Sequence, residues 1–174
     1  MNILDIAENS VKAGAALVRI TLDYGDDETL SLSIEDDGGG MTPEALSQVS
    51  DPFFTSRTTR KVGLGVPLLK MAAEMTGGSF SIESEKGRGT SVKALFHTDH
   101  IDLVPLGDIG STMSVLISAN PDMDFICAIK RNGGEFTLDS REIKQILGGV
   151  PVNSPEVAVF IKEFTEENSR ELFE

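Results

Sequence analysis

Residues 30–41 place a short alternating strand directly before an acidic, glycine-rich turn. Leu30, Leu32 and Ile34 alternate with polar residues, which predicts a half-buried β-strand. The sequence Asp-Asp-Gly-Gly-Gly-Met follows at 36–41, and its glycines permit a backbone course that other residues resist. An acidic glycine turn after a strand is a weak signal alone, because such turns are common. Its meaning therefore depends on what stands before and after it.

Three further motifs accompany this turn in a fixed order. The sequence Ile-Leu-Asp-Ile-Ala-Glu-Asn-Ser-Val-Lys-Ala-Gly-Ala lies upstream, at 3–15. Downstream, Gly63-Leu64-Gly65 opens an apolar helix, and Gly87-Arg88-Gly89-Thr90 leads into a strand. Four ordered motifs are far more specific than any one of them. Together they resemble the N, G1, G2 and G3 boxes of the GHKL ATPases, which include gyrase, heat-shock chaperones, histidine kinases and mismatch-repair ATPases.

The resemblance favours one branch of the superfamily and covers only part of the chain. The segment Asp-Pro-Phe-Phe-Thr-Ser-Arg at 51–57 is similar to the F box of histidine kinases, which favours that branch of the superfamily. The resemblance covers roughly residues 2–96, and the stretch after 97 matches none of the boxes. The chain begins inside the first box, so we expect its start to be trimmed or minimal relative to the family.

The periodicity of residues 1–97 predicts helices alternating with a mostly antiparallel sheet. We expect helices over 2–18 and 64–75, and strands over 19–23, 28–36, 79–83 and 90–96. Thr42 as N-cap and Pro43 at the first helical position predict a short helix there. The expected fold is α+β, a two-layer α/β sandwich. The resemblance implies the Bergerat type of that sandwich, the fold of the histidine-kinase ATPases.

Residues 98–174 are predicted to form a small C-terminal α+β module. A linker over 97–107 leads to a helix over 108–119 and to a hairpin around Asn132-Gly133-Gly134. Helices are expected over 140–147 and 155–170, the second capped by Ser154. This module carries no glycine phosphate loop and no metal cluster. We expect it to contact proteins, and its deletion to leave nucleotide affinity within a few-fold.

Composition narrows the classes of partner. The formal net charge of −13 makes the chain a poor candidate for binding nucleic acid or an anionic membrane surface. No apolar run approaches the ~20 residues that span a bilayer. The single cysteine, Cys127, cannot form an internal disulfide. We therefore expect a cytoplasmic protein that binds neither nucleic acid nor membrane.

The resemblance implies that the turn at 36–41 binds the adenine of ATP. A buried carboxylate at Asp36 would accept from the exocyclic amine, which selects adenine over guanine. Gly38 and Gly40 would let the backbone pass beneath the ring, and Met41 closes the same box. Thr90 matches the threonine of the last box, close to adenine. Without the other motifs, Asp36 would be interpreted as a strand-end cap and Thr90 as an ordinary strand residue.

The helix at 3–15 would then address magnesium and phosphate. Asn9 matches the asparagine that holds the metal, and a neutral amide oxygen suits Mg²⁺. Asp5, one turn earlier, matches the acidic residue that orients or deprotonates a nucleophile, where the family usually has glutamate. We expect the two to address one metal–phosphate centre. Lys12 matches a residue that reaches phosphate, although it also fits a surface lysine paired with Glu8.

A short lid and the start of the next helix complete the predicted phosphate site. Gly63, Leu64 and Gly65 would bring helix amides to the phosphates, where the helix dipole favours anions. Arg57 and Lys61 lie in the lid over 55–62 and supply cations. The family often has a glycine where Lys61 stands, two positions before Gly63. We expect the lid to become ordered when nucleotide binds.

Two classes of function fit these motifs. The first is an ATP-dependent kinase or weak ATPase of the histidine-kinase type that acts on a separate, unidentified protein. His97 and His100 lack the helical pattern of a phosphoacceptor, so the acceptor would belong to that partner; an anti-sigma-type serine kinase is a variant of this hypothesis. The second is a non-catalytic switch that binds ATP without consuming it. The aspartate at position 5 and the absent glycine favour the switch, and ATP turnover distinguishes the two.

Overall fold

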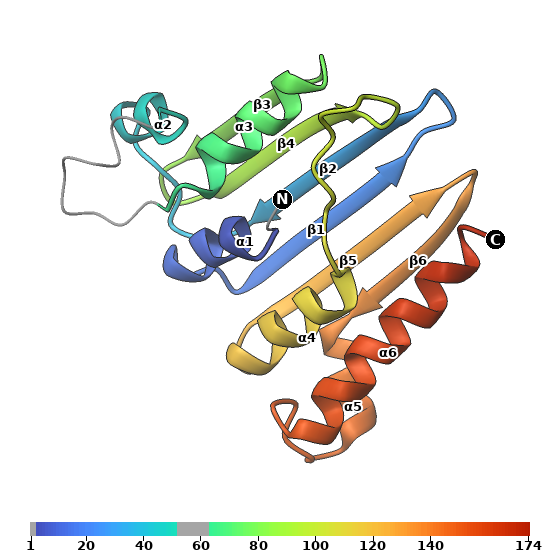
Figure 1. Cartoon of the computed structure of the whole chain (residues 1–174). Coiled ribbons are helices and arrows are strands. Elements are labelled where there is room, and N and C mark those ends of the chain that lie inside the picture. Colours follow the sequence, from blue (N-terminus) through green and yellow to red (C-terminus); the bar gives the residue numbers. More distant parts are fainter. Residues whose placement is uncertain (1–2, 52–62) are drawn as a thin grey trace.

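The fold is built on one mixed sheet with helices on one of its faces. The computed structural model describes residues 3–51 and 63–174. Six strands within these ranges form a single sheet in the order β3-β4-β2-β1-β5-β6 (Figure 1). The strands are β1 (Leu17–Tyr24), β2 (Thr29–Asp36), β3 (Ser79–Glu85), β4 (Gly89–His97), β5 (Asp124–Arg131) and β6 (Gly134–Asp139). All neighbouring pairs are antiparallel except β1 and β5, which are parallel.

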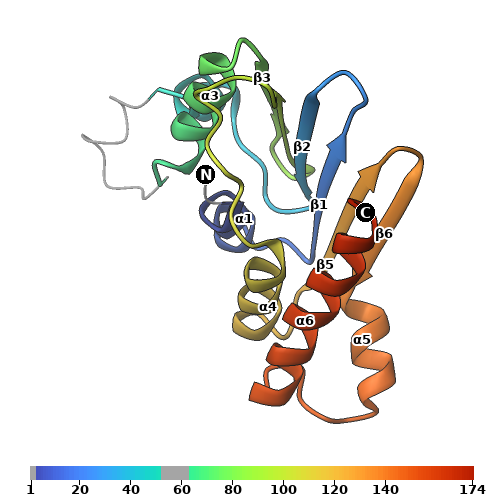
Figure 2. The same cartoon turned by 45° about the vertical axis from the view of Figure 1, so that its right-hand side comes forward.

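The helices form the second layer of the sandwich. They are α1 (Ile3–Lys12), α2 (Pro43–Val49), α3 (Gly65–Met75), α4 (Ile109–Ala119), α5 (Ser140–Leu147) and α6 (Pro155–Glu171). The turned view shows α1, α3, α4 and α6 on the same side of the sheet (Figure 2). The opposite face carries exposed polar side chains such as Arg19, Ser31 and Lys93. The sandwich therefore has one apolar core, and the predicted α+β two-layer fold is confirmed.

Helix α1 is shorter than the sequence pattern predicts. It ends at Lys12, because Gly14 adopts a positive φ of 70°. The N–H of Gly14 donates to the carbonyl of Val11, and the N–H of Ala15 donates to that of Ser10. These two bonds form a Schellman motif, in which a left-handed glycine closes the last turn. Ala15 is buried, and it lies beyond the end of the helix.

The C-terminal segment continues the sheet that begins in residues 1–97. β5 pairs with β1 along its whole length, from Leu17↔Asp124 to Tyr24↔Arg131. Side chains such as Phe125 from β5 and Ile117 from α4 belong to the same buried cluster as Ile20. Residues on both sides of the predicted domain boundary at 97 therefore share one continuous core. The division into two folding units remains a prediction.

The hairpin and helices of this segment lie where the sequence predicts them. Asn132, with φ of 51°, and Gly133 form the two-residue turn between β5 and β6. Ser154 occupies the N-cap position of α6, but its side chain makes no capping hydrogen bond. Burial raises the pKa of the Cys127 thiol to about 12, so this cysteine is a core residue rather than a nucleophile.

Candidate functional site

A cavity of about 580 Å³ lies between α1, the ends of β2 and β4, and the segment after β2. Six of the residues that the sequence singles out line it: Asn9, Lys12, Asp36, Gly40, Met41 and Thr90. The remaining lining residues are Ile6, Ser10, Ala13, Ile34, Val49, Val66, Ile82 and Val92. Most of these additional side chains are aliphatic. The cavity therefore combines an apolar wall with a few polar groups, the usual composition of a small-molecule site.

Asp36 is the fixed acidic group of the cavity. Its Oδ2 accepts a hydrogen bond of 2.6 Å from the Ser10 hydroxyl, and its Oδ1 accepts one of 2.9 Å from the Gly38 N–H. Both carboxylate oxygens thus have a protein donor, which holds the side chain in one orientation. Each oxygen retains a lone pair for a further donor. A ligand N–H group that reaches Asp36 would meet an oriented acceptor.

Thr90 stands directly opposite Asp36 in the sheet and is tied to Ser84. The two residues are register partners of β2 and β4. The Oγ atoms of Ser84 and Thr90 are 2.9 Å apart, Ser84 Oγ accepts from the Met41 N–H at 2.8 Å, and it is 3.0 Å from the Gly89 carbonyl. Ser84 has one proton for two acceptors. If Ser84 donates to Gly89, Thr90 donates to Ser84 and offers the cavity a lone pair. If Ser84 donates to Thr90, the Thr90 proton is available to a ligand.

Helix α1 brings Asn9 and Lys12 to the other part of the cavity. The Asn9 side-chain nitrogen is buried and has no hydrogen-bond partner in the described ranges. A buried amide without a partner is costly, and a ligand would satisfy it. The amide can present either its oxygen or its nitrogen, because the two are interchanged by a flip. Lys12 is exposed and lies 4.0 Å from Glu8, as predicted for an i,i+4 pair, a contact that contributes little to stability.

The glycines after β2 are needed for packing against protein. Gly40 has φ of 63°, and a Cβ there would stand 2.0 Å from the carbonyl oxygen of Glu85. A Cβ at Gly38 would approach the carbonyl oxygen of Ala13 at 3.0 Å. The sequence assigns both glycines to a passage beneath a ring. In the structure they also let this loop pass close to α1 and to the β3–β4 turn.

Asp5 does not line the same cavity as Asn9. It is exposed, and it borders a separate hollow of about 260 Å³ together with Gly65, Leu68, Met71 and Val104, among others. A Cβ at Gly65 would lie 3.2 Å from the Cβ of Asp5, so the start of α3 packs against it. The expected common centre of Asp5 and Asn9 is therefore divided between two hollows.

The remaining predicted residues lie at the edges of the site. Gly63 and Leu64 are exposed before α3, and neither lines the cavity. Arg57 and Lys61 fall in the segment 52–62, outside the described residues. Asp37, next to Asp36, is exposed, and it accepts hydrogen bonds from the N–H groups of Ala16 and Leu17 at 2.8 and 2.9 Å. It thus caps the start of β1 rather than facing only solvent.

Ser10 and Ser84 are the polar residues that the sequence pattern did not reveal. Ser10 is only 3% exposed although it is polar, and it follows Ile3 and Ile6 on the buried side of α1. A serine on an apolar helix stripe is a signal, because a buried hydroxyl needs a partner. Ser84 gives no comparable signal, since its role arises from pairing between β3 and β4.

Comparison with known proteins decides the family. The profile of the family described as "Histidine kinase-, DNA gyrase B-, and HSP90-like ATPase" matches residues 2–100. The chain belongs to this ATPase family. The match covers all four boxes and ends three residues after β4, so residues 101–108 and everything from α4 onward lie outside it.

The chain is similar to a sensor protein and to a DNA-repair protein. "Sensor protein SrrB" of Staphylococcus aureus, in strains NCTC 8325 / PS 47 and COL, is 40% identical over 95 residues. This segment covers 52% of this chain but only 16% of SrrB. A solved structure described as "Crystal Structure of N terminal domain of a DNA repair protein" has a TM-score of 0.52 at 17% identity. It covers 78% of this chain and 50% of the other, and it supports the fold alone.

Proposed function

We propose that this ATPase-family chain binds ATP with Mg²⁺ and uses it to act on, or to regulate, a separate protein. The observation that carries the proposal is the arrangement of Asp36. Its carboxylate is held by Ser10 and Gly38 in a cavity that is also lined by Asn9, whose buried side-chain nitrogen has no partner among the described residues. An oriented acceptor at one end and an unsatisfied amide at the other suit an adenine base joined to phosphates.

Adenine is the base that this site would select. The exocyclic amine of adenine can donate to Asp36, whereas guanine presents a carbonyl oxygen that a carboxylate repels. Aliphatic side chains such as Ile34, Ile82 and Val92 supply apolar surface for the flat ring. The Ser84–Thr90 pair can serve as donor or acceptor, so it can adjust to a ring nitrogen or to a bridging water.

Asn9 is the proposed magnesium ligand of the chain. A single neutral amide oxygen fits an ion that keeps most of its waters and takes other ligands from phosphate. When bound, Mg²⁺ would neutralise phosphate charge and orient the terminal phosphate. Among the described lining residues, Lys12 supplies the positive charge of the cavity. The sequence places Arg57, Arg60 and Lys61 nearby along the chain, and we propose that they contribute further charge.

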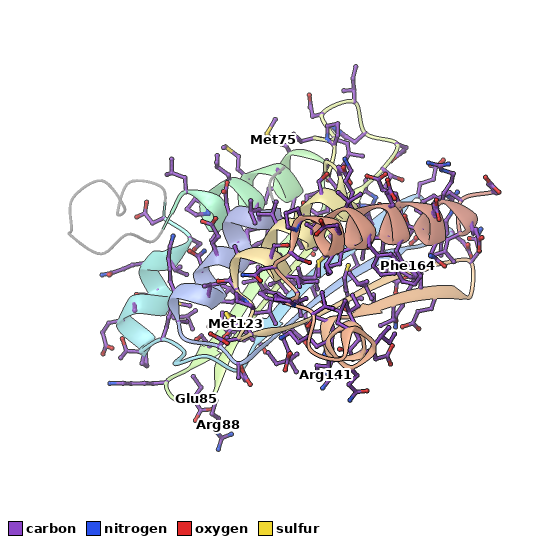
Figure 3. All side chains as sticks on the ribbon, turned by 90° about the horizontal axis from the view of Figure 1, so that it is seen from below. Met75, Glu85, Arg88, Met123, Arg141 and Phe164 are labelled. Carbon is purple, nitrogen blue, oxygen red and sulfur yellow. The ribbon has the colours of Figure 1, made fainter. Side chains whose placement is uncertain are left out.

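The surface beside Asp5 supports a protein as the partner. Leu64, Leu68, Met71 and Met75 recur at helical spacing along α3 and are each 50–55% exposed, with Met75 at the outer end of the helix (Figure 3). A methionine-containing apolar stripe of this kind is typical of protein-contact surfaces. Asp5 opens onto the hollow that this stripe borders. A partner side chain seated there would lie close to the proposed nucleophile-orienting carboxylate.

A non-catalytic switch is the second candidate, and the placement of Asp5 favours it. Asp5 lines a different hollow from Asn9, and aspartate is shorter than the glutamate that the family usually has. A carboxylate set back from the phosphates would orient a nucleophile poorly. In this reading ATP binds, alters the protein surface and is not consumed.

ATP consumption by wild-type protein and by Asp5→Asn distinguishes these candidates. Both proteins should bind ATP with similar affinity in calorimetry. A kinase or ATPase loses turnover in Asp5→Asn, whereas a switch shows no turnover in either protein. Wild-type protein should also be incubated with labelled ATP and the partners that it captures from its native cell. Loss of the labelled phosphoryl group in acid indicates a histidine acceptor, and its retention indicates a hydroxyl acceptor of the serine-kinase type. Absence of ATP binding would refute the proposal.

A further inference from the structure

A second cavity, of about 680 Å³, lies at the end of the sheet opposite the Asp36 cavity. Its floor is a single row of side chains across four strands. The register pairs Phe96 with Leu30, Leu30 with Tyr24, and Tyr24 with Arg131. All four side chains point to the helix-bearing face, because they continue the buried positions of their strands. The volume lies within the usual range for small-molecule sites.

Two walls of this cavity come from the part of the chain beyond the family match. The connection 98–107 runs from β4 to α4 on the helix side of the sheet and contributes Leu103 and Leu106 (Figure 1). Both leucines pack against the core, which anchors the connection over the sheet. Phe173, next to the C-terminal residue, forms the wall on the β5 side. The second cavity is therefore built from residues outside the four boxes of the nucleotide site.

The floor changes from apolar to polar along its length. Phe96 and Leu30 are buried hydrocarbon, whereas Tyr24 and Arg131 carry a phenol and a guanidinium. Strands lie about 4.8 Å apart, so the row spans about 14 Å from β4 to β5. A ligand lying across it would meet hydrocarbon at one end and hydrogen-bond donors at the other.

Tyr24 and Arg131 form the polar end, and both have unused donors. The Arg131 guanidinium lies 4.4 Å from the centre of the Phe173 ring, and this ring meets Tyr24 edge-on at 4.9 Å. Arg131 makes no ion pair with a carboxylate in the described ranges, and the Tyr24 hydroxyl has no hydrogen bond there. Burial raises the pKa of Tyr24, partly opposed by Arg131, so the phenol keeps its proton at neutral pH. A phenol and a guanidinium together suit a carboxylate.

The β1–β2 turn limits how much negative charge the cavity can accept. Asp26 and Glu28 also line the cavity, so its described lining carries two carboxylates and one guanidinium. Glu28 has φ of 57°, an uncommon backbone conformation for a residue other than glycine, and its carbonyl accepts from the Thr98 N–H at 2.7 Å. The two carboxylates disfavour polyanions such as nucleotides and leave a monoanion as the fitting charge.

We propose that this cavity binds a small amphipathic monocarboxylate, with its acid group at Arg131 and Tyr24 and its apolar body between the Leu30–Phe96 floor and the half-buried Leu103 and Leu106. This site is independent of the proposed nucleotide function. Octanoate is a suitable probe, because its chain is long enough to reach from the polar end towards β4. Octylamine and octanol are its matched cationic and neutral controls.

Ligand-observed NMR of the full chain tests the proposal by saturation transfer. Octanoate should bind with a millimolar or lower dissociation constant, and octylamine and octanol about tenfold or more weakly. Arg131→Gln should weaken octanoate about tenfold, whereas Arg19→Gln, the same charge change on the opposite face of the sheet, should leave it unchanged. Tyr24→Phe keeps the ring and should weaken octanoate binding several-fold. This variant tests the polar end of the cavity if Arg131→Gln does not fold. ATP with Mg²⁺ should not displace octanoate.

Four results would overturn this site. They are an absence of octanoate binding, octylamine or octanol binding as tightly as octanoate, unchanged octanoate affinity in the folded Arg131 and Tyr24 variants, and displacement of octanoate by ATP. The last result would place the probe in the Asp36 cavity. None of the four concerns ATP affinity, so failure of this site and failure of the nucleotide proposal are distinguishable.

Discussion

Ser10→Ala is the sharpest test of how the cavity prepares Asp36 for a ligand. The Ser10 hydroxyl is 3% exposed and donates to Asp36 Oδ2 at 2.6 Å. A hydrogen bond to a charged group contributes about 1.5–3 kcal/mol, and water entering the cavity would recover part of it. We therefore expect about 1–2 kcal/mol of lost binding free energy, which is about five- to thirtyfold in affinity.

The loss of affinity should be the same for every adenine ligand, whatever its number of phosphates. The affinities for adenosine, ADP and ATP should all fall by a similar factor in calorimetry, because the Ser10 hydroxyl is bonded to Asp36, the proposed partner of the base. Ser47→Ala is the matched control: the Ser47 hydroxyl is bonded to the Glu44 carbonyl on exposed α2, and its removal should change neither affinity nor fold. Thermal denaturation of both variants checks that each of them folds. ATP affinity unchanged in folded Ser10→Ala would show that this hydrogen bond does not prepare the site.

Three further perturbations test the magnesium ligand, the Asp139–Arg141 ion pair and the contribution of residues 98–174 to folding. Asn9→Ala should reduce the gain in ATP affinity that Mg²⁺ gives while leaving adenosine affinity unchanged, and a full metal response in calorimetry would contradict the assigned ligand. The pKa of Asp139 is lowered, chiefly by its hydrogen bond from Arg141. The ionised carboxylate therefore stabilises the fold fully above about pH 4, and this contribution is lost as the pH falls through the lowered pKa. In chemical denaturation, the free energy of unfolding of Asp139→Asn should fall less on acidification than that of the wild-type protein. Identical pH profiles for the two proteins would contradict this. Removing 98–174 should prevent cooperative folding, measured by circular dichroism, because β5 covers the edge of β1.

The C-terminal segment marks a limit of reasoning from the sequence. From the sequence, residues 98–174 were expected to be dispensable for nucleotide binding. The parallel pairing of β5 with β1 argues against that expectation, since Phe125 and Ile117 belong to the same core as Ile20, and the truncation tests it. Pairing between strands so distant along the chain leaves no local periodicity. The predicted elements were right, and their association was not visible.

The lining of the candidate cavity could be predicted wherever a motif encodes it locally. Asp36 and Thr90 come from separate boxes, and the register places them opposite each other. Asn9 and Lys12 line the predicted cavity, because both project from one side of α1. Asp5 was expected with them, but the start of α3 packs against it and gives it a different hollow. Helical spacing fixes a direction, and only tertiary packing decides what lies in that direction.

The early end of α1 and the role of Ser10 had signals that could be recognised. An alanine-flanked glycine at position 14 is typical of a helix end, and the structure uses it in that way. A polar residue on a buried stripe indicates a specific partner, and Ser10 bonds Asp36. Ser84 differs, because its bonds join the Met41 amide to Thr90 across segments that only the fold brings together.

Calorimetric titration with ATP and GTP, on wild-type protein and on Asp36→Asn, tests the central claim most directly. With Mg²⁺ present, wild-type protein should bind ATP and show no comparable affinity for GTP. Asp36→Asn should weaken ATP by about thirtyfold, since a hydrogen bond to a charged group contributes about 2 kcal/mol. Equal affinity for ATP and GTP, or unchanged ATP affinity in folded Asp36→Asn, would contradict the assignment of this cavity to adenine.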